Sequence, residues 1–467
     1  MRRLGYGCAL AIALLACACN AQRASAPSTT MTGEPPAALI AHVSAAAERI
    51  AEASDATPDA AWERLADLVD GYGHRITGSA SLEQALAWGA ARMRDDGLEE
   101  VRLEPVRVPH WLRGEERARI VHPVDRPLAL LGLGGSVGTR GTLRARVVAF
   151  EDLGALRAST SRLDGTIAFV NHRMPAYDET HDDPGYAYGM QARLHAASEA
   201  ARRGALAVLV RSVTAVSLRT PHAGALRYED GVRRIPAAAI STEDADFLAR
   251  LARRGSVEVE LALGARMLPD APSANAVGEL RGRELPDEIV LVGAHVDSWD
   301  VGQGAADDAA GCVAVMEALR LLRQSELTPR RTIRVVLFTG EEYGLAGARA
   351  YHRAHGGERH VAAFETDYGM GAPDAIGVDG EENVRAMAPL LPAFARFGIR
   401  RFRPRAFGAD VEPVVKDGAM AFSLLPDGRH YFDIHHTEAD TLDKIRPEDL
   451  RRNAAAIALL AYTLAER

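Results

Sequence analysis

Three short apolar runs in the second half of the chain are each followed by acidic or imidazole side chains. The runs are Glu288–Val292, Arg334–Thr339 and His360–Phe364. Apolar runs of this length are typical of strands buried on both faces, as in a parallel sheet. Between the first two runs, Cys312–Leu322 has the apolar spacing of a helix. This alternation predicts an α/β fold with a mixed, mostly parallel sheet flanked by helices.

The polar residues behind these strands are of the types that bind divalent metals. His295 and Asp297 follow the first strand, Glu341 and Glu342 the second, and Asp367 the third. Open α/β sheets bind ligands at the carboxyl ends of their strands, so these side chains are expected at one edge. Asp297 can orient the His295 ring. Glu341 and Glu342 allow two interpretations. One of them could bind a metal while the other accepts a proton, or both could belong to a solvated acidic turn.

Two more polar clusters extend the pattern. Asp307 and Asp308 precede the predicted helix, where they could bind metal or simply cap the helix. His435 and His436 lie in a polar loop, with Asp440 as a carboxylate that could orient an imidazole. A set of nitrogen and oxygen ligands without Cys suits zinc better than manganese or cobalt.

The four clusters resemble the motifs of the co-catalytic zinc exopeptidases. That family includes bacterial leucyl aminopeptidases and plasma glutamate carboxypeptidase, and the Ser-Trp-Asp-Val-Gly-Gln-Gly run is most similar to the latter branch. The resemblance spans nearly the whole chain after its first residues, and the motifs occur in the family's order. The stretches that carry it are Ala294–Asp308, Phe338–Leu345, Glu365–Gly369 and His435–Thr441.

The resemblance implies a metallo-exopeptidase that binds two zinc ions and hydrolyses short peptides through a metal-activated water. Glu341 is then the general base that takes the proton of this water. The implied zinc ligands are Asp307 between both ions, His295 and Asp367 at one ion, and Glu342 and His436 at the other.

Supporting roles follow from the same resemblance. Asp297 becomes the partner of the ligand His295, and Asp440 stays the candidate partner of His436. His435 stands beside the ligand where some relatives carry Tyr, a group thought to help hold the oxyanion. Either His435 or the nearby Tyr431 could take that part, and the sequence does not choose between them.

The composition of the chain and its first residues indicate where the protein is located in the cell and which partners it binds. At 467 residues and 47% hydrophobic content, two domains are expected, and a net charge of −8 argues against a nucleic-acid partner. Residues 1–19 read as a signal peptide, and Leu14–Cys17 resembles a bacterial lipobox that would lipidate Cys17, with ordinary cleavage as the alternative. Residues 20–36 would form a flexible tether. We therefore expect an exported envelope protein, either a lipoprotein that touches the membrane only through its anchor or a secreted protein.

The middle of the chain carries none of the metal motifs. Residues 37–129 and 264–467 are predicted to build the peptidase domain, and residues 130–263 resemble the protease-associated domain that several relatives insert into it. In relatives this domain covers the mouth of the active site and restricts substrate length. His222 and Arg227 are candidates for such a substrate contact, and an exposed loop is the alternative.

The sequence leaves two other functions open. A glutaminyl-cyclase-like acyltransferase uses a related fold with one zinc, and a non-catalytic envelope binding module should have lost ligands. The apparently complete ligand set favours a peptidase over both. The sequence does not choose between aminopeptidase, carboxypeptidase and dipeptidase action, and it leaves homodimerisation open.

Overall fold

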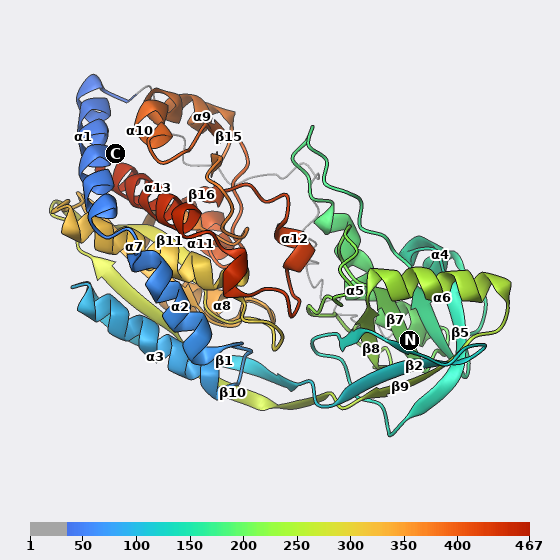
Figure 1. Cartoon of the computed structure of the whole chain (residues 1–467). Helices are drawn as coiled ribbons and strands as arrows, with labels where there is room; N and C mark the ends of the chain where they lie inside the picture. Colours follow the sequence, from blue (N-terminus) through green and yellow to red (C-terminus); the bar gives the residue numbers. More distant parts are fainter. Residues whose placement is uncertain (1–34) are drawn as a thin grey trace, which may run out of the picture.

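The computed structural model describes residues 35–467, which form two lobes joined by a pair of long strands (Figure 1). The predicted signal peptide at 1–19, with Cys17, lies outside the described residues, as does all but the end of the tether predicted at 20–36. Within residues 35–467 we find no helix with the length and apolar character needed to cross a bilayer.

The large lobe contains an eight-stranded sheet in the order β1–β10–β12–β11–β13–β16–β14–β15. In its centre β12, β11, β13 and β16 run parallel to one another, whereas β1, β10 and β14 add antiparallel pairs. The predicted mixed sheet is therefore confirmed. The strands are β1 (Glu99–Leu112), β10 (Arg266–Leu280), β11 (Leu285–His295), β12 (Arg331–Phe338), β13 (Arg359–Glu365), β14 (Ala375–Val378), β15 (Arg401–Arg403) and β16 (Met420–Leu425).

Helices cover both faces of this sheet because its central strands are apolar on both sides. Along β11, Val290 and Val292 belong to the core beneath α7 and α13, whereas Leu291 packs with Tyr351 of α8 and Val414 of α11. The helices of this lobe are α1 (Ala37–Ala56), α2 (Ala60–Tyr72), α3 (Ala80–Asp95), α7 (Ala310–Gln324), α8 (Ala346–His355), α9 (Glu381–Met387), α10 (Leu391–Ala395), α11 (Glu412–Lys416), α12 (Tyr431–Ile434) and α13 (Pro447–Glu466).

The small lobe holds a second eight-stranded sheet, in the order β3–β2–β9–β5–β6–β7–β8–β4. The strands are β2 (Glu116–His122), β3 (Arg126–Leu128), β4 (Leu130–Gly132), β5 (Leu143–Phe150), β6 (Thr166–Val170), β7 (Ala207–Arg211), β8 (Ala237–Ile240) and β9 (Glu258–Leu263). The helices are α4 (Leu153–Ala158), α5 (Tyr186–Arg202) and α6 (Thr242–Arg254).

The small lobe begins before the predicted boundary at residue 130. Strands β2 and β3 already belong to its sheet, since β2 pairs antiparallel with β9. The chain enters this lobe after β1 and leaves it before β10, so the antiparallel β1–β10 pair links the two lobes (Figure 1). The alternating pattern of β2 predicts a strand, but it carries no information on which sheet the strand joins.

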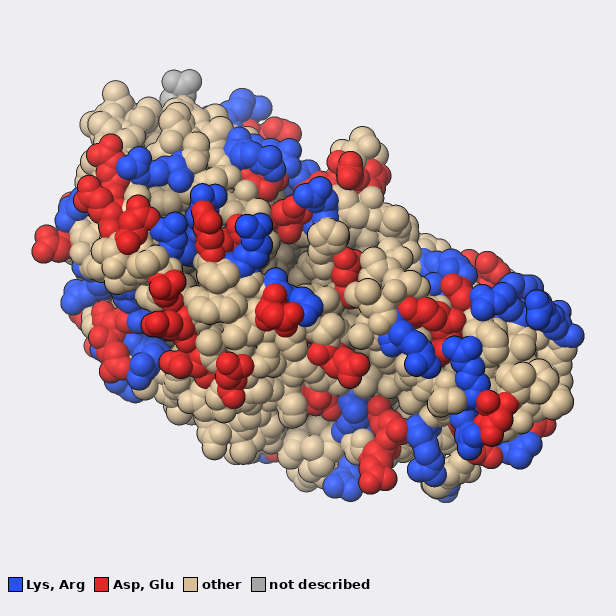
Figure 2. Space-filling view, viewed as in Figure 1, with Lys and Arg blue, Asp and Glu red and all other residues tan. Residues whose placement is uncertain are grey.

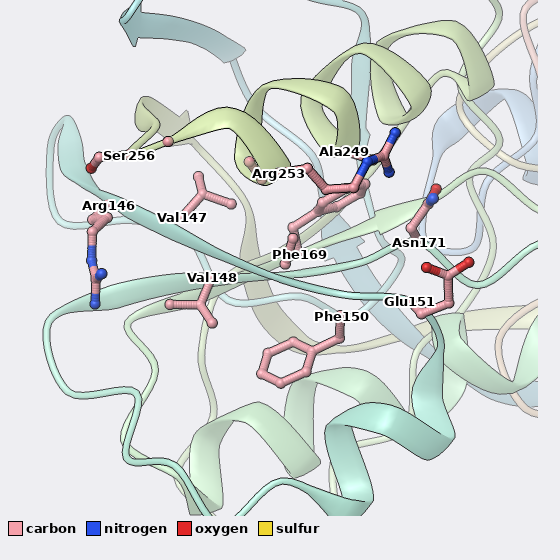
Figure 3. Close-up of a pocket in the computed structure, with 13 residues that line it drawn as sticks. Arg146, Val147, Val148, Phe150, Glu151, Phe169, Asn171, Ala249, Arg253 and Ser256 are labelled. Atoms are coloured by element: carbon pink, nitrogen blue, oxygen red, sulfur yellow. The ribbon is translucent and has the colours of Figure 1, made fainter.

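The surface and the cavities of the small lobe give no separate indication of function. Acidic and basic side chains are intermingled over the face shown in Figure 2. A cavity of about 400 Å³ lies between α6 and β5, with Phe150, Phe169 and Asn171 in its lining (Figure 3). None of the residues predicted for the metal site borders it.

Candidate metal centre

The carboxyl ends of three parallel strands meet at one edge of the large sheet. His295 is the last residue of β11, Glu341 and Glu342 follow β12, and Asp367 follows β13. Because β12 and β13 flank β11 in parallel register, their carboxyl ends lie side by side. A short distorted helix, η1 (Ala305–Ala309), adds Asp307 to this edge.

Asp307 lies between two imidazoles, with one carboxylate oxygen toward each. Its Oδ1 is 3.2 Å from Nε2 of His295, and its Oδ2 is 3.2 Å from Nε2 of His436. The His295 Nε2 atom is also 3.6 Å from Oδ1 of Asp367. The His436 Nε2 atom is 2.9 Å from Oε2 of Glu342. The structure thus brings together all five predicted ligands, in two groups that share Asp307.

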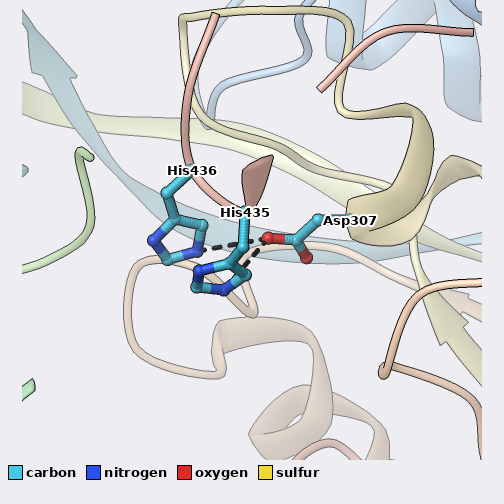
Figure 4. A group of neighbouring side chains, drawn as sticks. All are labelled: Asp307, His435 and His436. Carbon is cyan, nitrogen blue, oxygen red and sulfur yellow. Dashed lines mark ion pairs between the residues drawn. The ribbon is translucent and has the colours of Figure 1, made fainter. Parts of the chain in front are cut away.

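His435 also reaches this centre. Its Nε2 atom is 3.4 Å from Oδ2 of Asp307, and its ring stacks on that of His436 at 3.5 Å between centroids (Figure 4). Ligand atoms of Asp307, His435 and His436 are close enough together to hold one ion, as are those of His295, Asp307 and Asp367. His435 is therefore an additional candidate ligand in the group that contains His436. From the sequence it was predicted only as a possible oxyanion contact.

Several polar atoms of the cluster are buried without a hydrogen-bond partner among the described residues. They are Nε2 of His295, Oδ2 of Asp307 and Oε1 of Glu342. Each such atom would destabilise the fold by roughly 1–3 kcal/mol if nothing paired with it. The unpaired atoms are imidazole nitrogens and carboxylate oxygens, which are the usual zinc ligands. The residues present therefore fit a metal ion.

Electrostatics within the cluster supports the same conclusion. Burial, together with the Asp307 carboxylate, raises the pKa of Glu342 to about 7 although His436 opposes this. Burial also disfavours ionisation of Asp307, but His435, His295 and His436 outweigh it and hold the pKa of this carboxyl well below its usual range. A cation placed among these carboxylates would favour their ionised forms.

Glu341 differs from Glu342 in its contacts. Glu342 accepts a hydrogen bond from the Trp299 indole at 2.6 Å and faces His436. Burial raises the pKa of Glu341 well above its usual range, and the carboxylates of Asp367 and Glu342 add to this effect while His295 opposes it. A carboxyl that binds protons readily and stands beside the ligands is suited to proton transfer.

The structure corrects the predicted role of Asp297. The partner of His295 Nδ1 is the backbone carbonyl of Asp297 at 2.9 Å, whereas its carboxylate is 3.9 Å away. That carboxylate accepts the backbone N–H groups of Gly340, Glu341 and Glu342. The carboxylate oxygens that were predicted to bind the imidazole thus accept hydrogen bonds from three backbone N–H groups instead. Asp297 instead fixes the turn that carries both glutamates.

The predicted contact between Asp440 and His436 is also wrong. Asp440 accepts the backbone N–H groups of Ala306 at 2.7 Å and Asp307 at 3.2 Å. It therefore positions the segment that carries Asp307. The Nδ1 atom of His436 instead lies 3.4 Å from a nitrogen of Arg193.

The two acids of η1 have different positions. Asp307 lies between the imidazoles, whereas Asp308 accepts the backbone N–H of His295 at 3.3 Å. Both side chains are buried. The structure thus places the acid that the family resemblance selected at the centre of the cluster.

Tyr431 and His222 approach the centre, but Arg227 does not. The Tyr431 hydroxyl lies 3.5 Å from Oδ1 of Asp367. His222 is 1% exposed, and the next residue, Ala223, donates its backbone N–H to the His436 carbonyl at 2.8 Å. The loop then turns back to α5, so that Arg227 is exposed and its backbone N–H contacts Leu194. The prediction of Arg227 as a substrate contact is therefore not supported by its position.

Three residues near the centre escaped the sequence prediction. Trp299 lies within the recognised motif, which was the available signal for its contact with Glu342. Arg75 lies in a loop and Arg193 in helix α5, and neither residue belongs to a motif. Arg75 is fully buried and donates to backbone carbonyls of the segment after β11, among them those of Val296 and Gly304.

Comparisons with known proteins identify similar chains. The model of peptidase family M28 matches residues 275–461. Carboxypeptidase Q of Bos taurus and of Homo sapiens are each 38% identical to this chain over 410 residues, which is 87% of this chain and 85% of theirs. A crystal structure of a peptidase M28 precursor from Shewanella amazonensis has a TM-score of 0.86 at 36% identity and covers 92% of this chain and 98% of its own. A zinc aminopeptidase from Bacillus subtilis shares the fold, with a TM-score of 0.65 at 21% identity over 88% of this chain and 95% of its own.

Proposed function

The chain belongs to peptidase family M28 and is a zinc metallo-exopeptidase, and from this premise we propose that it hydrolyses dipeptides and other short peptides with two zinc ions. In this proposal Asp307 would contribute an oxygen to each of two zinc sites, with His295 and Asp367 as the other residues that would hold one ion and Glu342 and His436 as those that would hold the other. His435 is available as a further ligand of the second site.

One observation carries the proposal. The two oxygens of Asp307 face the Nε2 atoms of two different imidazoles, each at 3.2 Å. A carboxylate that served a single ion would need only one imidazole ligand beside it, whereas the two oxygens of Asp307 each face a different candidate ligand. A shared carboxylate also offsets part of the repulsion between two adjacent dications.

The residues around the ligands then have separate tasks. Zinc, when bound, supplies Lewis-acid polarisation of the scissile carbonyl and makes water more acidic. Glu341 accepts the proton of the attacking water and donates it to the leaving amine. The Tyr431 hydroxyl, close to Asp367, can donate to the developing oxyanion, because burial and the surrounding carboxylates keep its pKa well above the usual range and the phenol protonated.

The zinc requirement can be tested by removal and return of the metal. Chelation should abolish hydrolysis of a panel of dipeptides, and zinc should restore it. Peptides blocked at the N-terminus or at the C-terminus then separate aminopeptidase, carboxypeptidase and strict dipeptidase action. A chelated protein that still turned over every peptide at the original rate would contradict the proposal.

We also propose that the protein is exported to the bacterial cell envelope and is anchored there through Cys17. The support is the charged start, the apolar stretch and the Leu14–Cys17 motif, which lie outside the described residues. In the native host, Cys17→Ser should move the protein from the membrane fraction to the soluble fraction. Identical partitioning of the variant would exclude the lipid anchor.

A further inference from the structure

The candidate zinc ligands Glu342 and His436 are both connected to the small lobe, one of them through a tryptophan. The backbone carbonyl of His436 accepts the N–H of Ala223 at 2.8 Å. The carboxylate of Glu342 accepts the indole N–H of Trp299 at 2.6 Å. The Trp299 ring also meets the His436 ring edge-on, at 5.7 Å between centroids. One tryptophan therefore contacts both ligands of this group.

The other group of candidate ligands lies within the large lobe. His295 donates from Nδ1 to the backbone carbonyl of Asp297 at 2.9 Å, and its own carbonyl accepts the Cys312 thiol at 3.1 Å. Asp367 has the Tyr431 hydroxyl at 3.5 Å. Among the residues that the structure describes, none from the small lobe forms a hydrogen bond, an ion pair or a ring contact with His295 or Asp367. The two groups thus differ in how they depend on the small lobe.

Trp299 is held between the lobes and is 3% exposed. Its ring lies against the backbone of Gly134 in the small lobe, where a Cβ atom would come within 1.9 Å of the indole. Trp111, near the end of β1, packs edge-on against it at 6.4 Å between centroids. The next residue, Asp300, accepts a hydrogen bond from Nε of Arg113 at 2.8 Å, where the chain enters the small lobe. The position of the indole is therefore set by how the small lobe docks.

The residue after Glu342 rests on the same loop. A Cβ atom at Gly135 would lie 2.0 Å from the hydroxyl of Tyr343. The Tyr343 ring also meets the Trp299 ring edge-on, at 6.4 Å between centroids. Gly134 and Gly135 thus expose bare backbone to the two aromatic rings beside Glu342. A side chain at either position would displace a ring or separate the lobes.

We propose that Trp299 is a positioning residue that couples docking of the small lobe to zinc binding by Glu342 and His436, an assignment that rests on the proposed two-zinc function. Loss of a hydrogen bond to a ligating carboxylate usually weakens metal binding by about 10- to 100-fold, because the bond fixes the orientation of the ligand. If Glu342 turned away, the buried indole N–H would lose its acceptor. Zinc binding by His295 and Asp367 has no such link, so the docked lobe stabilises one zinc site and not the other.

The test compares the same exchange at two tryptophans of one cluster. Trp299→Phe removes the indole N–H that reaches Glu342. Trp111→Phe removes an indole N–H that donates at 2.9 Å to the backbone carbonyl of Ser136, which is not a ligand. Zinc is titrated into metal-free protein against a chromogenic chelator, which gives two dissociation constants. Trp299→Phe should raise one of them by about 10- to 100-fold and leave the other within about 2-fold, whereas Trp111→Phe should change neither.

A double-mutant cycle identifies the affected site. Glu342→Gln alters the acceptor of the indole hydrogen bond, so adding Trp299→Phe should weaken zinc binding little further. When Trp299→Phe is added to Asp367→Asn, it should have its full effect, because Asp367 belongs to the other group of ligands.

A second variant acts from the small lobe alone. Gly134→Ala places a methyl group against the indole and should raise the same dissociation constant, although this residue lies in the other lobe from Glu342. Gly255→Ala, also in the small lobe, is the matched control, because a Cβ atom there meets nothing within 4 Å. Excess zinc should restore kcat in Trp299→Phe and in Gly134→Ala with an unchanged KM. A general loss of packing would not be reversed by zinc.

Equal weakening of both zinc ions in Trp299→Phe, or an equal effect of Trp111→Phe, would show a merely structural role and overturn the proposal. Two unchanged dissociation constants in Trp299→Phe would overturn it as well. A wild-type protein that binds only one zinc ion would instead reject the proposed two-zinc function. In that case weaker binding of the single ion in Trp299→Phe, but not in Trp111→Phe, would still support the coupling, and unchanged binding would overturn it.

Discussion

The adjacent glutamates after β12 have contacts that predict different consequences of mutation. Glu342 faces His436 at 2.9 Å and is held by Trp299, as a ligand would be. Glu341→Gln keeps the size of the side chain but removes the proton acceptor. Turnover should therefore fall by about 10²- to 10⁴-fold, the usual contribution of general base catalysis, while the zinc content stays full. Glu342→Gln should weaken zinc binding, and excess zinc should restore part of the activity.

Steady-state kinetics and elemental analysis of the two variants check this prediction. If Glu341→Gln loses zinc while Glu342→Gln retains it, the two roles are reversed. If both variants hydrolyse dipeptides at the parent rate, the turn is merely a solvated acidic loop.

The clustering of the five candidate ligands could be predicted at the residue scale because their side chains stand in recognisable motifs. The partners of Asp297 and Asp440 could not be predicted, because both carboxylates bind backbone N–H groups that every residue offers. Arg193 was missed for another reason. An isolated arginine within a helix has no local signal, and its position at the centre depends on how the two lobes pack.

At the scale of elements, one guanidinium holds the segment between β11 and η1. Arg75 donates to the carbonyls of Gly73, Val296, Gln303 and Gly304 at 2.7–2.9 Å. Lysine has one nitrogen and cannot reach all of them. Arg75→Lys should therefore lower the free energy of unfolding by about 1–3 kcal/mol for the carbonyls left unpaired. Zinc should also bind more weakly, because this segment lies between the proposed ligands His295 and Asp307.

Urea unfolding and zinc titration of the same samples test the role of Arg75. Arg49→Lys, an exchange at a half-exposed residue of α1, is the matched control and should change neither quantity. Unchanged stability and unchanged zinc affinity in Arg75→Lys would contradict this role.

The central strands were the easiest elements to predict. Their uninterrupted apolar residues are buried on both faces, and each run ends in a motif. The assignment of β2 to the small sheet was beyond the sequence. A short strand with alternating burial can join either sheet, and only its pairing with β9 decides which.

At the scale of the whole molecule, the segment that precedes α5 in the sequence also contacts the large lobe. Asp182 forms an ion pair with Arg403 of the large lobe, and its carbonyl accepts from Arg405 at 2.8 Å. If the small lobe restricts the length of the substrate, loosening this contact should favour longer peptides. Asp182→Asn should raise kcat/KM for a tetrapeptide relative to a dipeptide by up to about 5-fold, the upper value for one surface ion pair.

The comparison of the two peptides in one assay measures this effect. Asp164→Asn breaks an exposed ion pair with Arg162 inside the small lobe and serves as the control. If the ratio of kcat/KM for the tetrapeptide to kcat/KM for the dipeptide is the same in Asp182→Asn as in this control, the contact does not govern substrate length.

A separate unit in the middle of the chain could be suspected from the sequence, because residues 130–263 carry none of the metal motifs. The arrangement of the two lobes could not be predicted, because it depends on contacts such as Ala223 with His436 and Tyr186 with Phe432. These contacts are between residues far apart in the sequence, and none of them belongs to a motif.

The bridging position of Asp307 is the central claim, and the zinc content of the active protein tests it most directly. Elemental analysis of the fully active, dialysed protein should give two zinc ions per chain, since His295 with Asp367 and His436 with Glu342 each complete a site around one oxygen of Asp307. One zinc ion per chain at full activity would contradict the account.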